Sequence, residues 1–146
     1  MMFLHQKLDY ELILVKSTQD LEDFFAEFRL NPTPLIAYDT ETTGLNIGLD
    51  KPFLIAVGYR KKIAVFEPER ELLRIFFRHV EMSKYLVAHN AKYDYHMLNN
   101  ICRDYNLNMP TQVRFLDTIH VARLTEFSDV KQSLSLEALG KKYVEH

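Results

Sequence analysis

Two apolar segments separated by three basic residues constrain the fold of this chain most strongly. Residues 53–59 and 63–66 are rich in branched and aromatic side chains, which favour strands. The connection at residues 60–62 is polar and far too short to hold a helix, so the two segments are predicted to form an antiparallel hairpin. A sheet that also receives strands from strand–helix–strand units must then be mixed.

The other apolar segments alternate between strand-like runs and helix-like periodicity. The run at residues 35–38 is nearly continuous, which predicts a strand buried on both faces. Pro68 is expected to open a helix, because proline is tolerated best at the first helical position. This order predicts an α/β domain with a mixed central sheet flanked by helices. Further strands are expected at residues 12–15, 85–88 and 113–116, and further helices after Ser17 or Thr18 and at residues 91–104, 117–124 and 134–143.

The composition is that of one compact domain. The chain has 146 residues, of which 47% are hydrophobic, enough for a core. Cys102 is the only cysteine, so no intrachain disulfide can form, and a cytoplasmic protein is expected. No segment approaches the roughly 20 apolar residues that span a bilayer, and no signal-peptide pattern is present. The net charge of −2 still allows a nucleic-acid enzyme that reaches phosphate through metal ions.

Asp39 and Glu41 form the sharpest local feature of the chain. They are two residues apart at the end of a strand-like run, so their side chains should point to the same face. Adjacent carboxylates repel each other, and a cation between them would relieve the repulsion. Oxygen ligands without cysteine or histidine suit Mg²⁺ or Mn²⁺ better than Zn²⁺. The alternative is a solvated turn at a strand end, since an Asp-x-Glu sequence alone is a common match.

Asp94 is expected on the buried face of a helix. It precedes Met97, Leu98 and Ile101 at helical spacing, which places all four side chains on one face. A lone acid in that position would be costly. It could pair with a lysine, an arginine or a backbone cap. With Asp39 and Glu41 available, a shared metal site is the better explanation.

Two motifs carry a family resemblance. Residues 39–45, Asp-Thr-Glu-Thr-Thr-Gly-Leu, resemble the first exonuclease motif of the DEDD superfamily. Residues 89–94, His-Asn-Ala-Lys-Tyr-Asp, resemble its second motif, in the form found in family A DNA polymerases and their phage relatives. Residues 115–118 and 133–143 are also similar to that group. The resemblance implies a ribonuclease H-like fold and a proofreading 3′–5′ exonuclease that works with a polymerase domain or subunit in DNA replication.

The resemblance also implies roles for individual residues. Asp39 would bridge two Mg²⁺ or Mn²⁺ ions, Glu41 would ligate one of them, and Asp94 would support the second through water. Two such ions can activate a water molecule and stabilise the departing 3′ oxygen, so the single-stranded 3′ end of DNA would be hydrolysed to nucleoside monophosphates. The implied substrate contacts are the backbone of Thr40 and Glu41 at the terminal sugar, Leu45 as a wedge beside the terminal base, and Asn90 and Tyr93 at the last nucleotides.

The family's third motif, Tyr-x-x-x-Asp or His-x-x-x-x-Asp, supplies a fourth carboxylate that this chain lacks. His89 and Asp94 have the second spacing, but they belong to a motif already assigned. The chain is therefore expected to be a single exonuclease-like domain, residues 1–146, truncated before the third motif. Loss of a positioned base typically removes about 10²–10⁴ in rate, so weak or no activity is expected from this chain alone. A longer chain, a separate subunit or a second copy could supply the missing acid.

Two other functions fit the same residues. An RNase D-like 3′–5′ exoribonuclease would share the fold and the carboxylates. A catalytically silent scaffold that binds DNA or a polymerase would explain the missing fourth acid, although it would need neither Asp39, Glu41 nor Asp94. The oligomeric state is left open by the sequence.

Three further polar residues are assigned ordinary roles. Asp117 could be a metal ligand, but it is expected to cap the helix that starts at Thr118. His89 is expected to pack or to form a hydrogen bond. His79 lacks metal-ligand spacing and is expected at the surface or at an interface.

Overall fold

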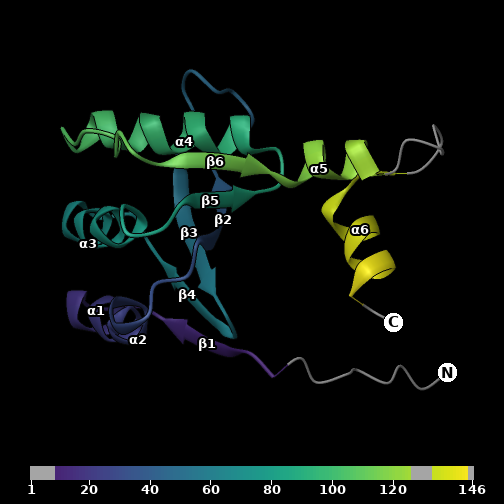
Figure 1. Ribbon diagram of the computed structural model, residues 1–146. Helices are drawn as coiled ribbons and strands as arrows, with labels where there is room; N and C mark the ends of the chain where they lie inside the picture. Colours follow the sequence, from purple (N-terminus) through teal and green to yellow (C-terminus); the bar gives the residue numbers. More distant parts are fainter. Residues whose placement is uncertain (1–8, 126–132, 145–146) are drawn as a thin grey trace, which may run out of the picture.

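One six-stranded sheet forms the centre of the computed structural model, which describes residues 9–125 and 133–144 (Figure 1). Every predicted strand is present, and one of them continues past its predicted end at Tyr38 to Thr42. This extension carries both Asp39 and Glu41 inside a strand rather than in the turn after it. The strands are β1 (Glu11–Leu14), β2 (Leu35–Thr42), β3 (Pro52–Tyr59), β4 (Lys62–Phe66), β5 (Tyr85–Ala88) and β6 (Arg114–Asp117).

The sheet is mixed, as predicted. Its spatial order is β1-β4-β3-β2-β5-β6, so β2 lies inside the sheet. Strand β3 pairs antiparallel with β2 and with β4, which confirms the hairpin, and the other pairs are parallel. Because β2, β5 and β6 run in the same direction, the residues that follow them meet at one edge of the sheet. Ligand sites of open α/β sheets commonly lie at such an edge.

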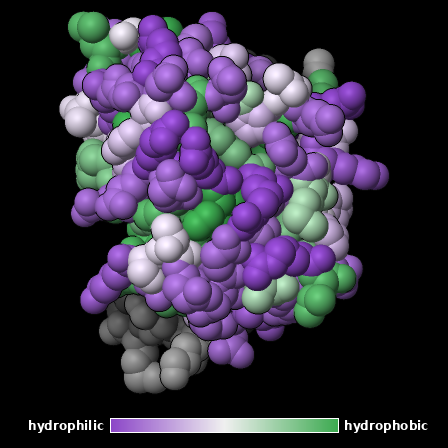
Figure 2. Space-filling model, turned by 90° about the vertical axis from the view of Figure 1, so that its left-hand side faces the viewer, coloured by the Kyte–Doolittle hydropathy of each residue, from purple (hydrophilic) through white to green (hydrophobic). Residues whose placement is uncertain are grey.

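The helices are distributed unevenly around the sheet. Figure 1 shows α1, α2 and α3 on one side, α4 alongside β5 and β6, and α5 and α6 beyond the end of β6. The side on which α1 and α3 lie has a mostly hydrophilic outer surface (Figure 2). The helices are α1 (Thr18–Phe24), α2 (Ala26–Leu30), α3 (Arg70–Val80), α4 (Ala91–Asp104), α5 (Thr118–Thr125) and α6 (Leu136–Tyr143).

Two helix starts show how the local sequence acts. Ser17 caps α1: its hydroxyl accepts from the backbone N–H of Asp20, whose carboxylate accepts from the backbone N–H of Ser17. The single helix predicted here is divided at Phe25 into α1 and α2. Pro68 does not open α3, because Glu69 is the N-cap and Arg70 the first helical residue.

The core lies between the sheet and the helices α1 to α4. The apolar residues that the sequence predicted for the inner faces of these helices are buried in it. They include Leu21 on α1, Phe28 on α2, and Leu73 and Phe76 on α3. The prediction that β2 is buried on both faces is wrong. Ile36 and Tyr38 are buried on one face, but Ala37 and Asp39 on the other face are exposed.

Within the same described ranges, no helix is long and apolar enough to cross a membrane. Helix α1 packs on α3, and α4 packs on β2, β3, β5 and β6.

Candidate active site at the end of strand β2

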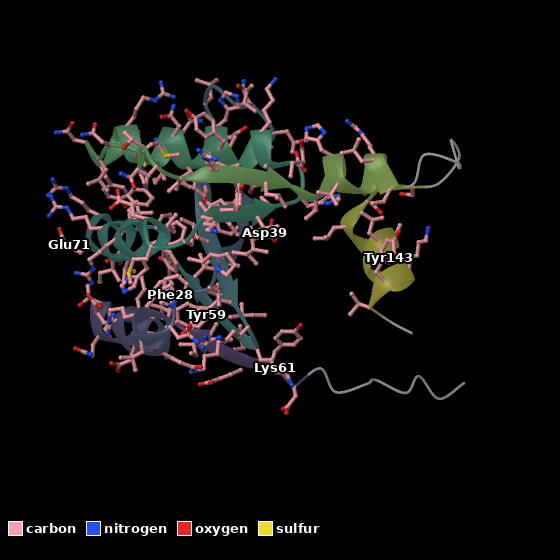
Figure 3. The ribbon with its side chains drawn as sticks, in the orientation of Figure 1. Phe28, Asp39, Tyr59, Lys61, Glu71 and Tyr143 are labelled. Atoms are coloured by element: carbon pink, nitrogen blue, oxygen red, sulfur yellow. The ribbon has the colours of Figure 1, made fainter. Side chains whose placement is uncertain are left out.

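Asp39 and Glu41 lie on the uncovered face of β2. Both side chains are exposed, and they alternate with Tyr38 and Thr40, which face the helices. Neither carboxylate accepts a hydrogen bond or forms an ion pair with any residue that the structure describes. Figure 3 shows Asp39 near the middle of the molecule, at the sheet. The strand therefore holds two unpartnered carboxylates side by side.

A hollow of about 300 Å³ adjoins Asp39 on this face. Residues of β2, β3, β4 and β5 line it, among them the small Ala37, Ala56 and Gly58, and Leu136 of α6 contributes to its wall. The Asp39 carboxylate therefore borders open space.

Asp94 is buried on the other side of β2, as its helical spacing predicted. It is 3% exposed, in the first turn of α4, and Thr40 Oγ1 donates a hydrogen bond to Asp94 Oδ1 at 2.7 Å. Burial raises the pKa of Asp94 to about 6, with a further increase from nearby Asp39 and an opposing effect of the Thr40 hydrogen bond. This hydrogen bond connects the two sequence motifs, which lie about fifty residues apart in the chain.

The three acids do not form one ligand cluster. Among residues 9–125 and 133–144, no group of three His, Cys, Asp or Glu side chains is close enough to hold a metal ion. The physical reason is strand alternation: Asp39 and Glu41 point to one face of β2, and Thr40, which contacts Asp94, points to the other. The shared metal site stays a prediction: Asp39 and Glu41 form a pair on one face of β2, and the buried carboxyl of Asp94 lies beside Thr40 on the other.

The pair itself fits a hard divalent cation. Mg²⁺ is usually bound by one or two carboxylates and completes its shell with water and substrate oxygens. Asp39 and Glu41 supply two such carboxylates, open to solvent and without a hydrogen bond or ion pair to the described part of the chain. No sulfur or imidazole ligand is needed, so the donor set suits Mg²⁺ or Mn²⁺.

Tyr93 is tied to the loop that follows β2. Its hydroxyl donates to the carbonyl of Gly44 at 2.6 Å and lies 2.5 Å from Thr42 Oγ1. The expected substrate contact of Tyr93 would therefore involve the ring rather than the hydroxyl. Thr42 in turn donates to the Gly44 carbonyl at 3.0 Å. These bonds fix the first turn of α4 against the end of β2.

Two residues that the sequence did not single out shape this loop. Asp50 accepts from Thr43 Oγ1 at 2.9 Å and from the backbone N–H of Asn46 at 2.7 Å. The amide of Asn100, which is buried, donates to two loop carbonyls. A Cβ at Gly44 would lie 2.6 Å from Asp50 Oδ2, so a larger residue there would displace the Asp50 carboxylate from these bonds. The sequence signal for Asn100 was its place among the apolar residues of the helix that became α4.

The remaining predicted substrate residues border the same place. Leu45, on this loop, is 86% exposed, as a wedge residue would need to be. Asn90 is exposed and precedes α4 with a left-handed φ of 69°. Asp117 caps α5 as predicted, because its Oδ1 accepts from the backbone N–H of Ile119 at 2.9 Å. Asp117 also accepts from two backbone N–H groups at the start of α4, which the sequence did not predict.

Sequence comparisons identify relatives of the chain. A model of the RNase_H superfamily matches residues 36–145. The DNA polymerase DpoZ of Salmonella phage PMBT28 is 34% identical over 127 residues, covering 80% of this chain and 18% of the polymerase. The chain thus spans less than a fifth of that relative's length.

Solved structures are similar in fold at low sequence identity. Escherichia coli RNase D, described as an exoribonuclease involved in structured RNA processing, has a TM-score of 0.63 at 17% identity, covering 94% of this chain and 34% of RNase D. Brucella melitensis NrnC has a TM-score of 0.62 at 14% identity over 94% of this chain and 60% of NrnC, and related structures hold Mg²⁺ or pGG. The Aedes aegypti Nibbler EXO domain has a TM-score of 0.61 at 15% identity, covering 82% of this chain and 58% of that domain.

Proposed function

Because the chain belongs to the RNase_H superfamily, we propose that it is a divalent-metal-dependent 3′–5′ exonuclease domain with its site at the end of β2. The observation that carries this proposal is the pair of unpartnered carboxylates, Asp39 and Glu41, beside the buried carboxyl of Asp94. Exposed acids without partners are ordinary, but two on one strand face, next to a third that is costly to bury, need an explanation. Metal binding at this edge of the sheet provides one.

The roles of the residues follow from their positions. Asp39 would hold both ions, Glu41 one of them, and Asp94 would act through water, since its carboxyl faces Thr40 rather than the pair. When bound, two divalent ions would supply an activated water and stabilise the departing 3′ oxygen. Leu45 would pack beside the terminal base, the Thr40 backbone would lie at the terminal sugar, and Asn90 and the ring of Tyr93 would contact the last nucleotides.

The proposed substrate is the single-stranded 3′ end of DNA, in the service of polymerase proofreading. The support is the 34% identity with DpoZ, named as a DNA polymerase, which exceeds the identity with the structurally similar nucleases described above. The partner would then be a polymerase domain or subunit. This assignment of partner and substrate concerns the whole protein to which such a domain contributes.

An RNase D-like 3′–5′ exoribonuclease is the second candidate. It is favoured by the fold similarity to RNase D, an exoribonuclease, over 94% of this chain. Digestion of matched single-stranded DNA and RNA oligonucleotides separates the two candidates. Preference for DNA supports proofreading, and preference for RNA supports the exoribonuclease.

A catalytically silent scaffold that binds DNA or a polymerase is the third candidate. It is favoured by the absence of a three-ligand metal group among the described residues. Titration with Mg²⁺ and Mn²⁺ by calorimetry discriminates: a chain that binds neither ion would favour the scaffold. Binding that disappears when both Asp39 and Glu41 are replaced would favour an enzyme.

The activity test uses a 3′-mismatched primer with Mn²⁺. Release of nucleoside monophosphates is the expected activity. Replacement of Asp39 by alanine should reduce the rate by more than about a hundredfold, since metal-derived charge stabilisation is worth several kcal/mol. Glu71→Ala, an exposed acid on α3, serves as the control. Equal rates in wild type and Asp39→Ala would contradict the proposed site.

A further inference from the structure

Asp117 stands at the junction of two strand–helix turns. It is the last residue of β6 and lies opposite Ala88, the last residue of β5, in the parallel register. Its carboxylate therefore reaches the start of α4, which follows β5, as well as the start of α5, which follows β6. The side chain is 12% exposed, so most of its hydrogen-bonding capacity is directed into the protein.

Three backbone N–H groups donate to this carboxylate. Asn90 donates to Oδ1 at 3.0 Å, Ala91 to Oδ2 at 3.0 Å and Ile119 to Oδ1 at 2.9 Å. Helix starts present N–H groups without helical partners, and a carboxylate satisfies them through both hydrogen bonds and the helix dipole. Asp117 does so for α4 and α5 at once, whereas the side chain of Asn90, the N-cap of α4, makes no cap bond.

The turn that Asp117 holds has an unusual backbone conformation. Asn90 has a φ of 69°, a left-handed conformation that most residues avoid and that asparagine, after glycine, adopts most readily. His89, one residue earlier, forms a 2.8 Å hydrogen bond through Nδ1 with Thr118 Oγ1, next to Asp117. Thr118 also donates to the Ala88 carbonyl at 3.3 Å. Side chains from the β6–α5 turn thus form the hydrogen bonds that hold the β5–α4 turn in place.

This fastening bears on the proposed active site. Asp94 and Tyr93 lie in the first turn of α4, and a helix start that shifts would carry both side chains with it. We propose that Asp117 is a positioning residue, which sets the first turn of α4 so that Asn90, Tyr93 and Asp94 meet the end of β2. This inference rests on the proposed nuclease function and extends it to a residue outside both exonuclease motifs.

The competing explanation is that Asp117 only caps α5. Two substitutions separate the roles. Serine at position 117 can still accept from the N–H of Ile119 as an ordinary N-cap, but it is too short to reach α4. Asparagine keeps an oxygen in the place of Oδ1, which accepts from both Asn90 and Ile119. Thus Asp117→Ser preserves the cap alone, and Asp117→Asn preserves the cap and one of the two bonds to α4.

Two measurements on folded variants test the proposal. Amide hydrogen exchange reports on the N–H groups of Asn90, Ala91 and Ile119 without requiring any activity. Fluorescence anisotropy with a short 5′-labelled oligothymidylate in Mg²⁺, protected by a terminal phosphorothioate, reports on binding at the 3′ end. Circular dichroism fixes a temperature at which every variant is folded. Glu71→Gln controls for the loss of one negative charge at a distance from the site.

The expected result is specific to Asp117→Ser. Its Asn90 and Ala91 amides should exchange at least about tenfold faster while Ile119 stays protected, and its dissociation constant should rise about tenfold. Asp117→Asn should stay within about twofold of wild type in binding, as should Glu71→Gln.

Wild-type exchange and binding in Asp117→Ser would overturn the positioning role and leave a simple cap. Faster exchange at Asn90 and Ala91 with unchanged binding would also overturn it, because the turn would then not matter for substrate. If wild type itself binds no oligonucleotide, the proposed nuclease function fails, and the exchange data still decide whether Asp117 holds the turn.

Discussion

Asp94 illustrates at the scale of one residue how a proposed active site can cost stability. Its carboxyl is 3% exposed, receives one hydrogen bond from Thr40 and lies near the negative charge of Asp39. Burial raises the pKa of Asp94 to about 6 from an ordinary value of 3.8. A raised pKa means that the folded state holds the proton more tightly than the unfolded state does. The contribution of Asp94 to the free energy of unfolding is therefore complete below about pH 4 and is lost as the pH rises through about 6.

Asp94→Asn should accordingly stabilise the protein at neutral pH. The shift of about two pKa units corresponds to at most about 3 kcal/mol, and the neutral amide can still accept from Thr40 Oγ1. Urea unfolding at several pH values measures the free energy of unfolding. The variant should exceed wild type at pH 8, and the difference should shrink towards pH 5. The same change at exposed Asp23 is the control. A variant less stable than wild type at pH 8 would contradict this account.

At the scale of elements, a buried histidine joins the α1–α2 pair to α3. His79 is fully buried, not at the surface, and its ring stacks on Phe25 with centroids 4.2 Å apart. Its Nδ1 donates to the Ile75 carbonyl at 2.7 Å, so its Nε2 is the acceptor for Arg29 at 2.9 Å. This arrangement requires the neutral imidazole. The sequence predicted a histidine at the surface or at an interface, whereas His79 lies buried between helices.

The contact between these helices should weaken in acid. Burial, with Arg29 and Arg78 nearby, lowers the pKa of His79, although its bond to the Ile75 carbonyl acts in the opposite direction. For a base with a lowered pKa, the unfolded state takes up the proton first. The stabilisation that neutral His79 gives the folded state is thus complete above about pH 6.5. It is lost as the pH falls through the pKa of His79 in the folded protein.

His79→Gln tests this dependence. Glutamine can accept from Arg29 but does not titrate, so the fall in unfolding free energy between pH 7 and pH 5 should be smaller than in wild type. Chemical denaturation across this range provides the measurement. His96→Gln, at a histidine on α4, is the matched control. Equal slopes in His79→Gln and wild type would show that the histidine is not responsible.

At the scale of the whole molecule, the sheet is covered unequally. Helices α1 to α4 build the core on one side, while Asp39 and Glu41 stand on the other beside an open hollow. The two carboxylates therefore contribute little to folding and remain available to bind an ion. A ligand that binds only the folded state stabilises the whole domain by mass action.

Mg²⁺ should therefore raise the thermal stability of the entire chain. At a concentration ten times its dissociation constant the gain is about 1.4 kcal/mol. For a domain of this size, that corresponds to about 4 °C in Tm. Differential scanning calorimetry with and without Mg²⁺ measures the shift. Asp39→Asn and Glu41→Gln should each reduce it, and Glu71→Gln should not. A shift that survives both substitutions would place the ion elsewhere.

Local periodicity was enough to predict part of this structure. The hairpin, the strand and helix order, the burial of Asp94 and the common face of Asp39 and Glu41 all follow from spacings of a few residues. The open face of β2, the Thr40–Asp94 hydrogen bond and the contact of Asp117 with α4 became visible only in the folded chain. Those contacts join residues 26 to 54 positions apart. They depend on which strands become neighbours and on how the helices pack, which no short-range pattern encodes.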